Sequence, residues 1–224
     1  MTSSGAVRTI VRRLDKRFGP LEVPRRWDPL EELVYTVLSQ NTSDANSERA
    51  FAALRDRFPS WDELADAQVR SIAAAIRSGG LANTKAPRIK AILREIRERE
   101  GAIDLSWMNR ASDEEVSDYL ASLPGVGAKT VACVLAFSLG RPALPVDTHV
   151  HRVARRLGLI PDKSTAEAAH RLLEELVPPA LRVPAHVGLI RLGREICKAG
   201  RPRCEDCPLS NLCPTAPPVL SKSG

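Results

Sequence analysis

Aromatic side chains, long apolar runs and strand-like patterns are all scarce in this sequence of 224 residues. Aromatic residues make up only 4% of the chain, which argues against a platform that binds single strands by base stacking. No apolar run is long enough to span a membrane, and the N-terminus has no apolar segment typical of a secretory signal. No alternation of apolar and polar residues marks a strand. These absences favour a helical protein without a membrane partner.

Positive charge is in modest excess. The chain has 33 Lys and Arg against 27 Asp and Glu, a formal net charge of +6, and a sequence pI near 9.3. This balance suits a polyanionic partner, although it is a weak signal by itself. The Arg-rich segment 6–18 resembles a transit peptide in composition, but its apolar spacing favours a first helix that packs one face inward. That face consists of Val7, Ile10, Val11 and Leu14.

Helical periodicity runs through almost the whole chain. Asp28 precedes Pro and Glu in the pattern of a helix start, and Ser60 and Ser112 each begin a capping-box pattern. Asn83 is expected to cap a further helix. Later helices are expected at 148–157, 165–177 and 184–196. The sequence therefore predicts an all-α protein that is long enough to bury a large core in one domain or two.

A helical hairpin is predicted around Leu-Pro-Gly-Val-Gly at 123–127. Pro124 stops the first helix because it lacks an amide donor, and Gly125 and Gly127 permit the backbone angles of a tight turn. The second helix should run from about Ala128–Leu139. Amide groups at such a turn and helix start can hold a phosphate oxygen.

Lys129 and Asp147 are the candidate catalytic residues. A cation in the first turn of a helix opposes the macrodipole, and this field with partial burial favours the neutral, nucleophilic amine. The alternative for Lys129 is an ordinary solvated lysine. Asp147 precedes a helix, so the alternative for it is a simple N-cap.

Four cysteines cluster near the C-terminus with the spacing C-x6-C-x2-C-x5-C. They are Cys197, Cys204, Cys207 and Cys213. Clustering of this kind indicates a metal centre and a reducing compartment rather than disulfides. By ligand type alone, either a structural zinc ion or an iron–sulfur cluster fits.

Three cations lie between the first two of these cysteines, at Lys198, Arg201 and Arg203. A loop closed through a metal and carrying such charges suits a clamp on DNA phosphates. The alternative is that these charges are solvated and only balance the metal centre.

The pattern Leu-Pro-Gly-Val-Gly-x-Lys-Thr followed by Val-Asp-Thr-His resembles the helix-hairpin-helix DNA glycosylases, most closely the endonuclease III family. The resemblance extends from about Val7 to Pro214. It implies that Lys129 forms a Schiff base with DNA, that Asp147 is the catalytic aspartate, and that the four cysteines hold a [4Fe–4S] cluster.

The resemblance also implies two loops that enter the duplex when a nucleotide is turned out of the stack. Gln40 matches the gap-filling glutamine, and Leu81 matches an apolar wedge. Without the resemblance, Gln40 is a polar turn residue and Leu81 is a core contact.

The domain organisation follows from the same resemblance. Residues 22–140 are expected to form a six-helix barrel with the hairpin. Residues 1–21 and 141–214 are expected to form an iron–sulfur cluster domain, with a DNA-binding cleft between the two domains and a C-terminal tail at 215–224.

The expected function is a DNA N-glycosylase and AP lyase that removes oxidised pyrimidines from double-stranded DNA and nicks the strand by β-elimination. We expect a monomer that acts on damaged or abasic DNA in the cytoplasm, associated with the nucleoid. The alternatives are another glycosylase of this superfamily, specific for 8-oxoguanine or for mismatches, and a non-catalytic DNA-binding repair module.

Overall fold

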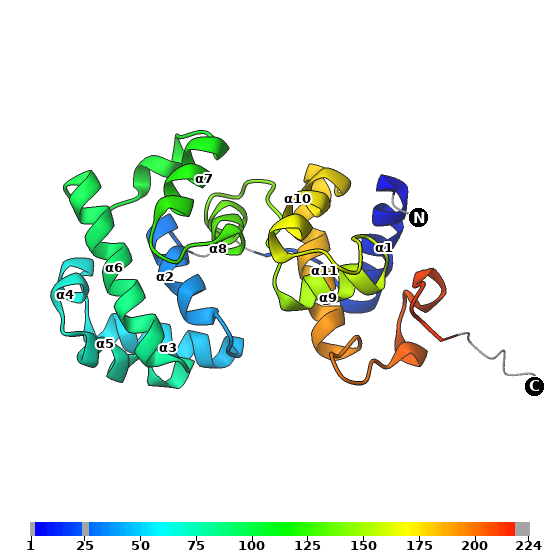
Figure 1. Cartoon of the computed structure of the whole chain (residues 1–224), viewed down its shortest axis with the longest axis horizontal. Helices are drawn as coiled ribbons and strands as arrows, with labels where there is room; N and C mark the ends of the chain where they lie inside the picture. The colour runs from blue at the N-terminus through cyan, green and yellow to red at the C-terminus, as the bar shows by residue number, and fades with distance from the viewer. Residues whose placement is uncertain (1–2, 24–26, 218–224) are drawn as a thin grey trace, which may run out of the picture. The chain divides into compact units, whose positions relative to one another are not determined.

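A computed structural model describes residues 3–23 and 27–217 of the chain. The described residues are helical, with no strand among them, as predicted (Figure 1). The α-helices are α1 Ser4–Phe18, α2 Pro29–Ser39, α3 Asp44–Arg57, α4 Trp61–Asp66, α5 Val69–Ala75, α6 Ala82–Glu100, α7 Asp113–Ser122, α8 Ala128–Cys133, α9 Thr148–Arg156, α10 Ala166–Leu176 and α11 Arg182–Glu195.

Short helical turns connect several of these helices. They are η1 Arg77–Gly79, η2 Ser106–Asn109, η4 Pro179–Leu181, η5 Cys204–Asp206 and η6 Ser210–Leu212, all of the 3₁₀ type, and the π-helical η3 Val134–Ser138. No helix among the described residues is both long and apolar enough to cross a membrane.

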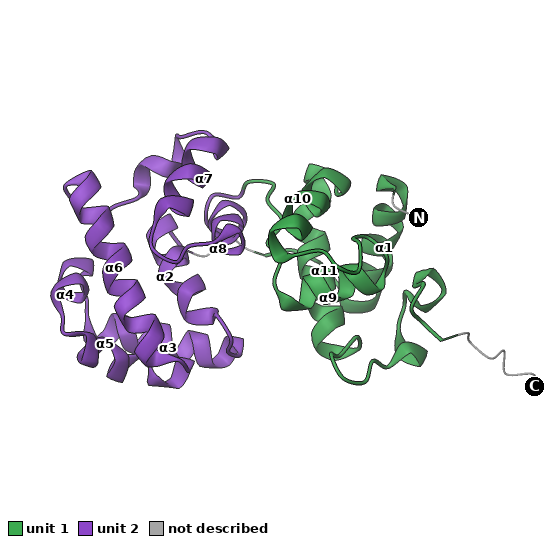
Figure 2. Ribbon diagram, in the orientation of Figure 1, with its two compact units in different colours: residues 1–24, 141–224 green, residues 25–140 purple. Residues whose placement is uncertain are grey.

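The chain divides into two compact units (Figure 2). Unit 1 combines Met1–Pro24 with Arg141–Gly224, and unit 2 is Arg25–Gly140. The sequence placed the first boundary at residue 22 and the second at 140. Thr215, assigned by the sequence to a tail, donates to the Arg156 carbonyl oxygen at 3.1 Å, whereas 218–224 of that tail lie outside the described residues.

Unit 2 is built around α2 and α6, whose apolar faces are buried as predicted. The periodic apolar residues of these helices are Leu30, Leu33, Val34, Val37, Leu38, Ile89, Ile92, Leu93 and Ile96, each at most 3% exposed. At about 25 cal/mol per Å² of apolar surface removed from water, such faces are the main stabilising contribution to the helices.

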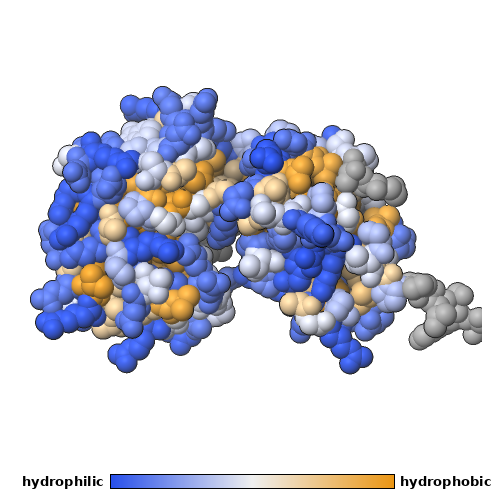
Figure 3. All heavy atoms as spheres, in the orientation of Figure 1, coloured by the Kyte–Doolittle hydropathy of each residue, from blue (hydrophilic) through white to orange (hydrophobic). Residues whose placement is uncertain are grey.

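Hydrophilic side chains cover most of the face of the molecule seen in Figure 3.

Unit 1 has its own core, in which α1 packs against α11 and α9 also packs against α11. The predicted inward face of α1 is buried together with apolar residues of α9, α10 and α11. Gly188 of α11 allows a close approach, because a Cβ added there would lie 2.9 Å from Cδ1 of Leu14. The N-terminal helix is thus an integral part of unit 1.

Local sequence signals fixed most helix starts. The Asp28 carboxylate accepts from the amides of Leu30 and Glu31 at 2.9 and 3.0 Å, and Ser112 with Glu115 forms a complete capping box. The predicted cap at Asn83 is wrong. Helix α6 begins two residues earlier, after Leu81, whose carbonyl oxygen accepts from the amide of Lys85 at 2.9 Å.

Candidate functional site

The helical hairpin joins α7 to α8 through the predicted turn. Helix α7 ends at Ser122, before Pro124, and Gly125 adopts a φ of +71°, a conformation that glycine tolerates far better than other residues. A Cβ at Gly125 would also lie 2.6 Å from Nε of Arg88. Gly127 caps α8 with an ordinary φ of −110°, and a Cβ there would meet nothing within 4 Å. The backbone therefore requires glycine at position 125, whereas position 127 has room for a side chain.

Helix α8 continues in an altered form beyond Cys133. The expected helix to Leu139 changes at Val134 into the π-helical η3, in which the amide of Leu139 donates to the Val134 carbonyl oxygen at 3.1 Å. Single π-turns within α-helices are rare and occur frequently at functional sites. No sequence pattern predicted this change of helix type.

Lys129 lies in the first turn of α8 and is half-buried. Its side chain is a hydrogen-bond partner of the buried Cys133 thiol, one turn further on, and so is the side chain of Thr36 from α2. Burial raises the pKa of Cys133, and the positive charge of Lys129 and then these two hydrogen bonds oppose the rise. The amine is thus not simply solvated, but packs beside polar groups in unit 2.

The polar groups behind Lys129 extend into α2. Thr36 Oγ1 donates to Glu32 Oε1 at 3.1 Å, and both side chains are at most 3% exposed. The charge of Glu32 also raises the pKa of Cys133. The sequence did not single out Glu32 or Thr36, because each occupies a helical position that reads as ordinary.

Asp147 is the N-cap of α9, as one of its two interpretations predicted. Its Oδ1 accepts from the amide of Val150 at 2.8 Å, and the side chain is half-buried. One carboxylate oxygen is therefore used by the cap. Asp147 belongs to unit 1 and Lys129 to unit 2.

Two loops of unit 2 carry the predicted DNA-inserting residues. Leu81 is 54% exposed, so its interpretation as a core contact is wrong. Gln40 ends α2 and is half-buried, with Oε1 accepting from Arg88 Nη1 at 2.9 Å. Its neighbour Asn41 is exposed and has a φ of +54°, while Leu81 has a φ of +50°. Among the described residues, these are the two non-glycine residues with positive φ.

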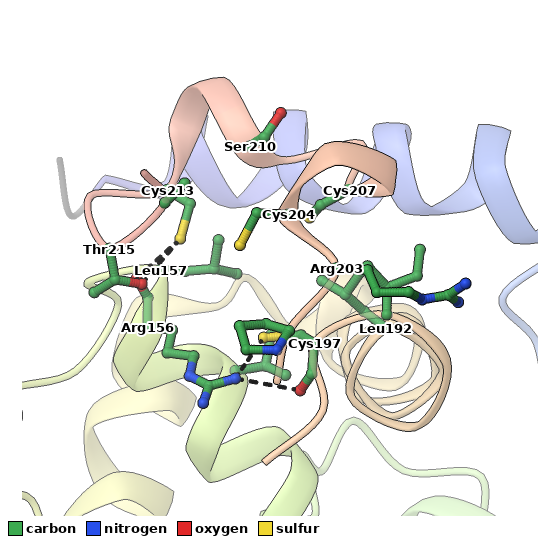
Figure 4. A pocket seen from close by; sticks show the side chains of 14 residues that line it. Arg156, Leu157, Leu192, Cys197, Arg203, Cys204, Cys207, Ser210, Cys213 and Thr215 are labelled. Carbon is green, nitrogen blue, oxygen red and sulfur yellow. Dashed lines mark hydrogen bonds between the residues drawn. The ribbon is translucent and has the colours of Figure 1, made fainter. Parts of the chain in front are cut away.

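The four clustered cysteines line one pocket of about 260 Å³ in unit 1 (Figure 4). Residues 3–23 and 27–217 contain no group of three or more His, Cys, Asp or Glu placed to hold a metal ion. A zinc ion would need each sulfur at about 2.3 Å, whereas the pocket that the four cysteines line has room for a group of several atoms. A four-thiolate set around such a space fits an iron–sulfur cluster.

The thiols of this pocket repel one another as thiolates. Burial raises the pKa of Cys204 and of Cys207, and the negative charge of the neighbouring cysteines raises both further. A bound cationic metal centre relieves both costs, because it compensates charge that would otherwise be buried.

Arg156 of α9 holds the first cysteine loop by hydrogen bonds, and no sequence pattern pointed to this residue. Its Nη1 donates to the Cys197 sulfur at 3.3 Å (Figure 4). The same Nη1 donates to the Lys198 carbonyl oxygen at 2.8 Å, and Nη2 donates to the Ala199 carbonyl oxygen at 2.9 Å. The Arg156 carbonyl oxygen accepts from Cys213 Sγ at 3.2 Å. One residue thus contacts both ends of the cysteine cluster.

The three predicted phosphate-binding cations, Lys198, Arg201 and Arg203, are all exposed. Arg203 is partly engaged within unit 1, since its Nη2 donates to the Glu195 carbonyl oxygen at 2.8 Å and its Nη1 lies 3.4 Å from Asp206 Oδ2. Arg201 therefore offers the simpler test of a role in binding phosphate.

Comparison with known proteins identifies the family. Residues 34–179 match the model described as HhH-GPD superfamily base excision DNA repair protein, and residues 197–213 match the iron-sulfur binding domain of endonuclease III. The chain belongs to the HhH-GPD superfamily of DNA glycosylases, in its endonuclease III-like branch. Its cofactor is a [4Fe–4S] cluster, as predicted.

Individual relatives agree with this assignment. The chain is 37% identical to endonuclease III of Thermotoga maritima over 207 residues, covering 92% of each chain. It is 40% identical to a putative DNA glycosylase of Arabidopsis thaliana over 189 residues, covering 80% of this chain and 64% of that protein. A trapped covalent endonuclease III–DNA intermediate has a TM-score of 0.82 at 28% identity, covering 96% of this chain and 97% of the other.

Proposed function

We propose that this protein is a bifunctional DNA N-glycosylase and AP lyase that excises oxidised pyrimidines from double-stranded DNA. The observation that carries the proposal is Lys129, half-buried in the first turn of the second hairpin helix and hydrogen-bonded beside Cys133. The relatives described above include a covalent endonuclease III–DNA intermediate. A lysine amine is the group that forms such an adduct with a sugar aldehyde carbon.

In the proposed reaction, the Lys129 amine attacks C1′ of the damaged nucleotide. The N-glycosidic bond breaks, and the base departs with its bonding electron pair and a proton. The C1′–O4′ bond of the sugar ring then opens, O4′ takes up the proton lost by the amine, and Lys129 is left joined to C1′ as a Schiff base. Asp147 stabilises the positive charge that develops on the sugar and assists removal of the proton from the attacking amine. Loss of a C2′ proton then expels the 3′ phosphate, and water releases Lys129 from the cleaved strand.

The remaining candidate residues bind and hold the DNA. Gln40 and Leu81 enter the duplex where the nucleotide has left, and the amides around Gly125 and Gly127 contact a phosphate. Around the metal centre, Lys198, Arg201 and Arg203 contact the backbone.

Cys197, Cys204, Cys207 and Cys213 would hold the [4Fe–4S] cluster. When bound, the cluster closes the C-terminal loops into the form that presents these cations. We assign it this structural role in the proposal.

Borohydride trapping on duplex DNA with one abasic site tests the catalytic assignment. The wild-type protein should form a covalent protein–DNA adduct, because borohydride reduces the Schiff base to a stable amine. Lys129→Gln should abolish the adduct while retaining DNA binding. The exposed Lys163 provides the matched control, and Lys163→Gln should trap at the wild-type rate. Normal trapping by Lys129→Gln would refute the assignment.

A panel of duplexes tests the substrate class. Duplexes of one sequence that carry an oxidised pyrimidine, uracil, 8-oxoguanine or a mismatch at the same position should be compared for their rates of base release under single-turnover conditions. The oxidised pyrimidine should be released fastest. Faster release of another base would replace the proposed substrate, and absence of any release together with tight binding would favour a non-catalytic repair module.

A further inference from the structure

Lys85 of α6 joins the stems of the two loops that carry Gln40 and Leu81. Its side chain is buried, with 2% exposure. Its Nζ donates to the Leu38 carbonyl oxygen at 2.6 Å and to the Gly79 carbonyl oxygen at 2.8 Å. Leu38 lies two residues before Gln40, and Gly79 lies two residues before Leu81. A single ammonium group therefore holds the two chain segments from which the loops start.

The surroundings of Lys85 are unusual for a buried cation. Burial lowers its pKa, with no neighbouring charge contributing, and both hydrogen-bond acceptors are backbone carbonyl oxygens at the ends of helical segments. Helix C-termini leave such carbonyl groups without amide partners and attract cations. Burial of the ammonium group therefore costs solvation free energy. Its hydrogen bonds to the two loop stems offset part of this cost.

Arg88 lies one turn further along the same helix and contacts both Gln40 and the hairpin turn. Its Nη1 donates to Gln40 Oε1 at 2.9 Å. Its Nε would lie 2.6 Å from a Cβ built at Gly125, so the guanidinium group packs directly on the hairpin turn. Arg88 therefore links the Gln40 loop to the hairpin that carries Lys129.

Both loops have a strained backbone at their exposed residues. Asn41 and Leu81 adopt φ values of +54° and +50°. Such values are unfavourable for most residues with a Cβ, including leucine, whereas asparagine tolerates them better. They persist where the surroundings enforce them. Strain of this kind occurs often at ligand-contacting sites. The hydrogen bonds of Lys85 and Arg88 lie on the segments next to these two residues.

We propose that Lys85 and Arg88 are positioning residues that hold the Gln40–Asn41 loop and the Leu81 loop together, as one preformed element that opens the duplex around a damaged nucleotide. This inference rests on the proposed function, because it takes the two loops to enter DNA. Preorganisation of this kind lowers the cost of ordering the loops during binding. Neither residue needs to touch the reacting atoms.

The experiment compares trapping on duplex DNA with trapping on the single strand of the same sequence, each with one abasic site. A single strand has no stack to open, so the ratio of the two trapping rates reports on duplex opening and not on the reactivity of the amine. Lys85→Met should lower this ratio by about tenfold and leave the single-strand rate within about twofold of wild type. Arg88→Met should lower the ratio by a smaller factor.

Lys90 provides a matched control on the same helix. Its Nζ also donates to a helix-terminal carbonyl oxygen, that of Ala67 after α4, but it contacts neither loop stem. Lys90→Met should therefore lower the thermal unfolding temperature without changing the ratio. Lys85→Arg, which keeps a buried donor, should recover part of the ratio lost in Lys85→Met. If Lys85→Met does not fold, the ratio of duplex to single-strand trapping rates is compared for Arg88→Met and Lys85→Arg instead.

A second signal distinguishes opening from chemistry. Fluorescence of 2-aminopurine placed next to the abasic site should rise on binding of the wild-type protein, and should rise less with Lys85→Met at saturating protein. An unchanged ratio and unchanged fluorescence in Lys85→Met and Arg88→Met would overturn the inference. Absence of trapping by the wild-type protein on both DNAs would instead refute the proposed function itself.

Discussion

The carboxylate of Asp147 accepts a 2.8 Å hydrogen bond from the amide of Val150 and so begins helix α9. Asparagine caps helices about as well as aspartate, whereas alanine loses the cap at a cost of about 1 kcal/mol. The structural role and the proposed catalytic role of Asp147 can therefore be separated by two substitutions at one position.

We expect Asp147→Asn to retain wild-type stability and DNA affinity but to lose base release almost completely, because the amide keeps the cap and cannot stabilise positive charge. Asp147→Ala should lose both activity and about 1 kcal/mol of unfolding free energy. Thermal unfolding and single-turnover base release measure the two effects. If Asp147→Asn released the base at the wild-type rate, Asp147 would be only a cap.

Leu81 allows stability to be separated from function in a similar way. Leu81→Ala and Leu81→Gly both remove the proposed wedge, so both should be slow on damaged duplex DNA. Glycine accepts the φ of +50° without steric cost, and alanine does not, so Leu81→Gly should be the more stable of the pair by about 1 kcal/mol. Denaturant unfolding of the two variants checks the order. Wild-type activity in both would show that the side chain is not a wedge.

Arg201 tests the phosphate clamp. Arg201→Gln should weaken binding to DNA of any sequence and reduce the slope of log affinity against log salt by about one. Arg110 is also exposed but belongs to unit 2 and not to the cysteine loops of unit 1, and Arg110→Gln should leave the slope unchanged. Fluorescence anisotropy at several salt concentrations provides the measurement. Equal slopes in the two variants would show that Arg201 is only a solvated charge.

Substitution of Arg156 tests how firmly the metal centre is held. Arg156→Met should release the cluster to a chelator about ten times faster than wild type, because removal of a hydrogen-bond donor to a ligand weakens a metal site. Its neighbour Arg155 is 42% exposed on its side chain and faces Asp162, so Arg155→Met is the control. The loss is followed by the visible absorption of the cluster.

The assignment of the ligands themselves has a simpler test. Cys204→Ser should lack the visible absorption of the cluster, and Cys133→Ser should keep it, since Cys133 is buried in unit 2. A colourless Cys133→Ser protein would contradict the ligand set, and wild-type absorption in Cys204→Ser would do so as well.

Short-range signals in the sequence predicted the helices and the spacing of the cysteines. Apolar periodicity, proline and capping residues act within a few positions, which is why α2 and α9 begin where the sequence indicated. Family resemblance then supplied the candidate roles of Lys129 and Asp147, and these roles remain predictions.

Long-range contacts explain what the sequence did not predict. No sequence pattern singled out Lys85 or Arg156, because the importance of each depends on a carbonyl or sulfur atom more than 40 residues away. Asparagine predicts a positive φ less strongly than glycine does. At Asn41 the surrounding loop enforces this angle. The same holds for the missed π-helical turn after Cys133.

Unit 1 is made from both ends of the chain, whereas unit 2 is one continuous segment. During synthesis, the residues of unit 2 are all available before α11 exists, so unit 2 can fold first. Helix α1 has to wait, because α11, against which it packs, is synthesised only after all of unit 2. The four cysteines follow later still, which makes loading of the iron–sulfur cluster a late step in the maturation of this enzyme.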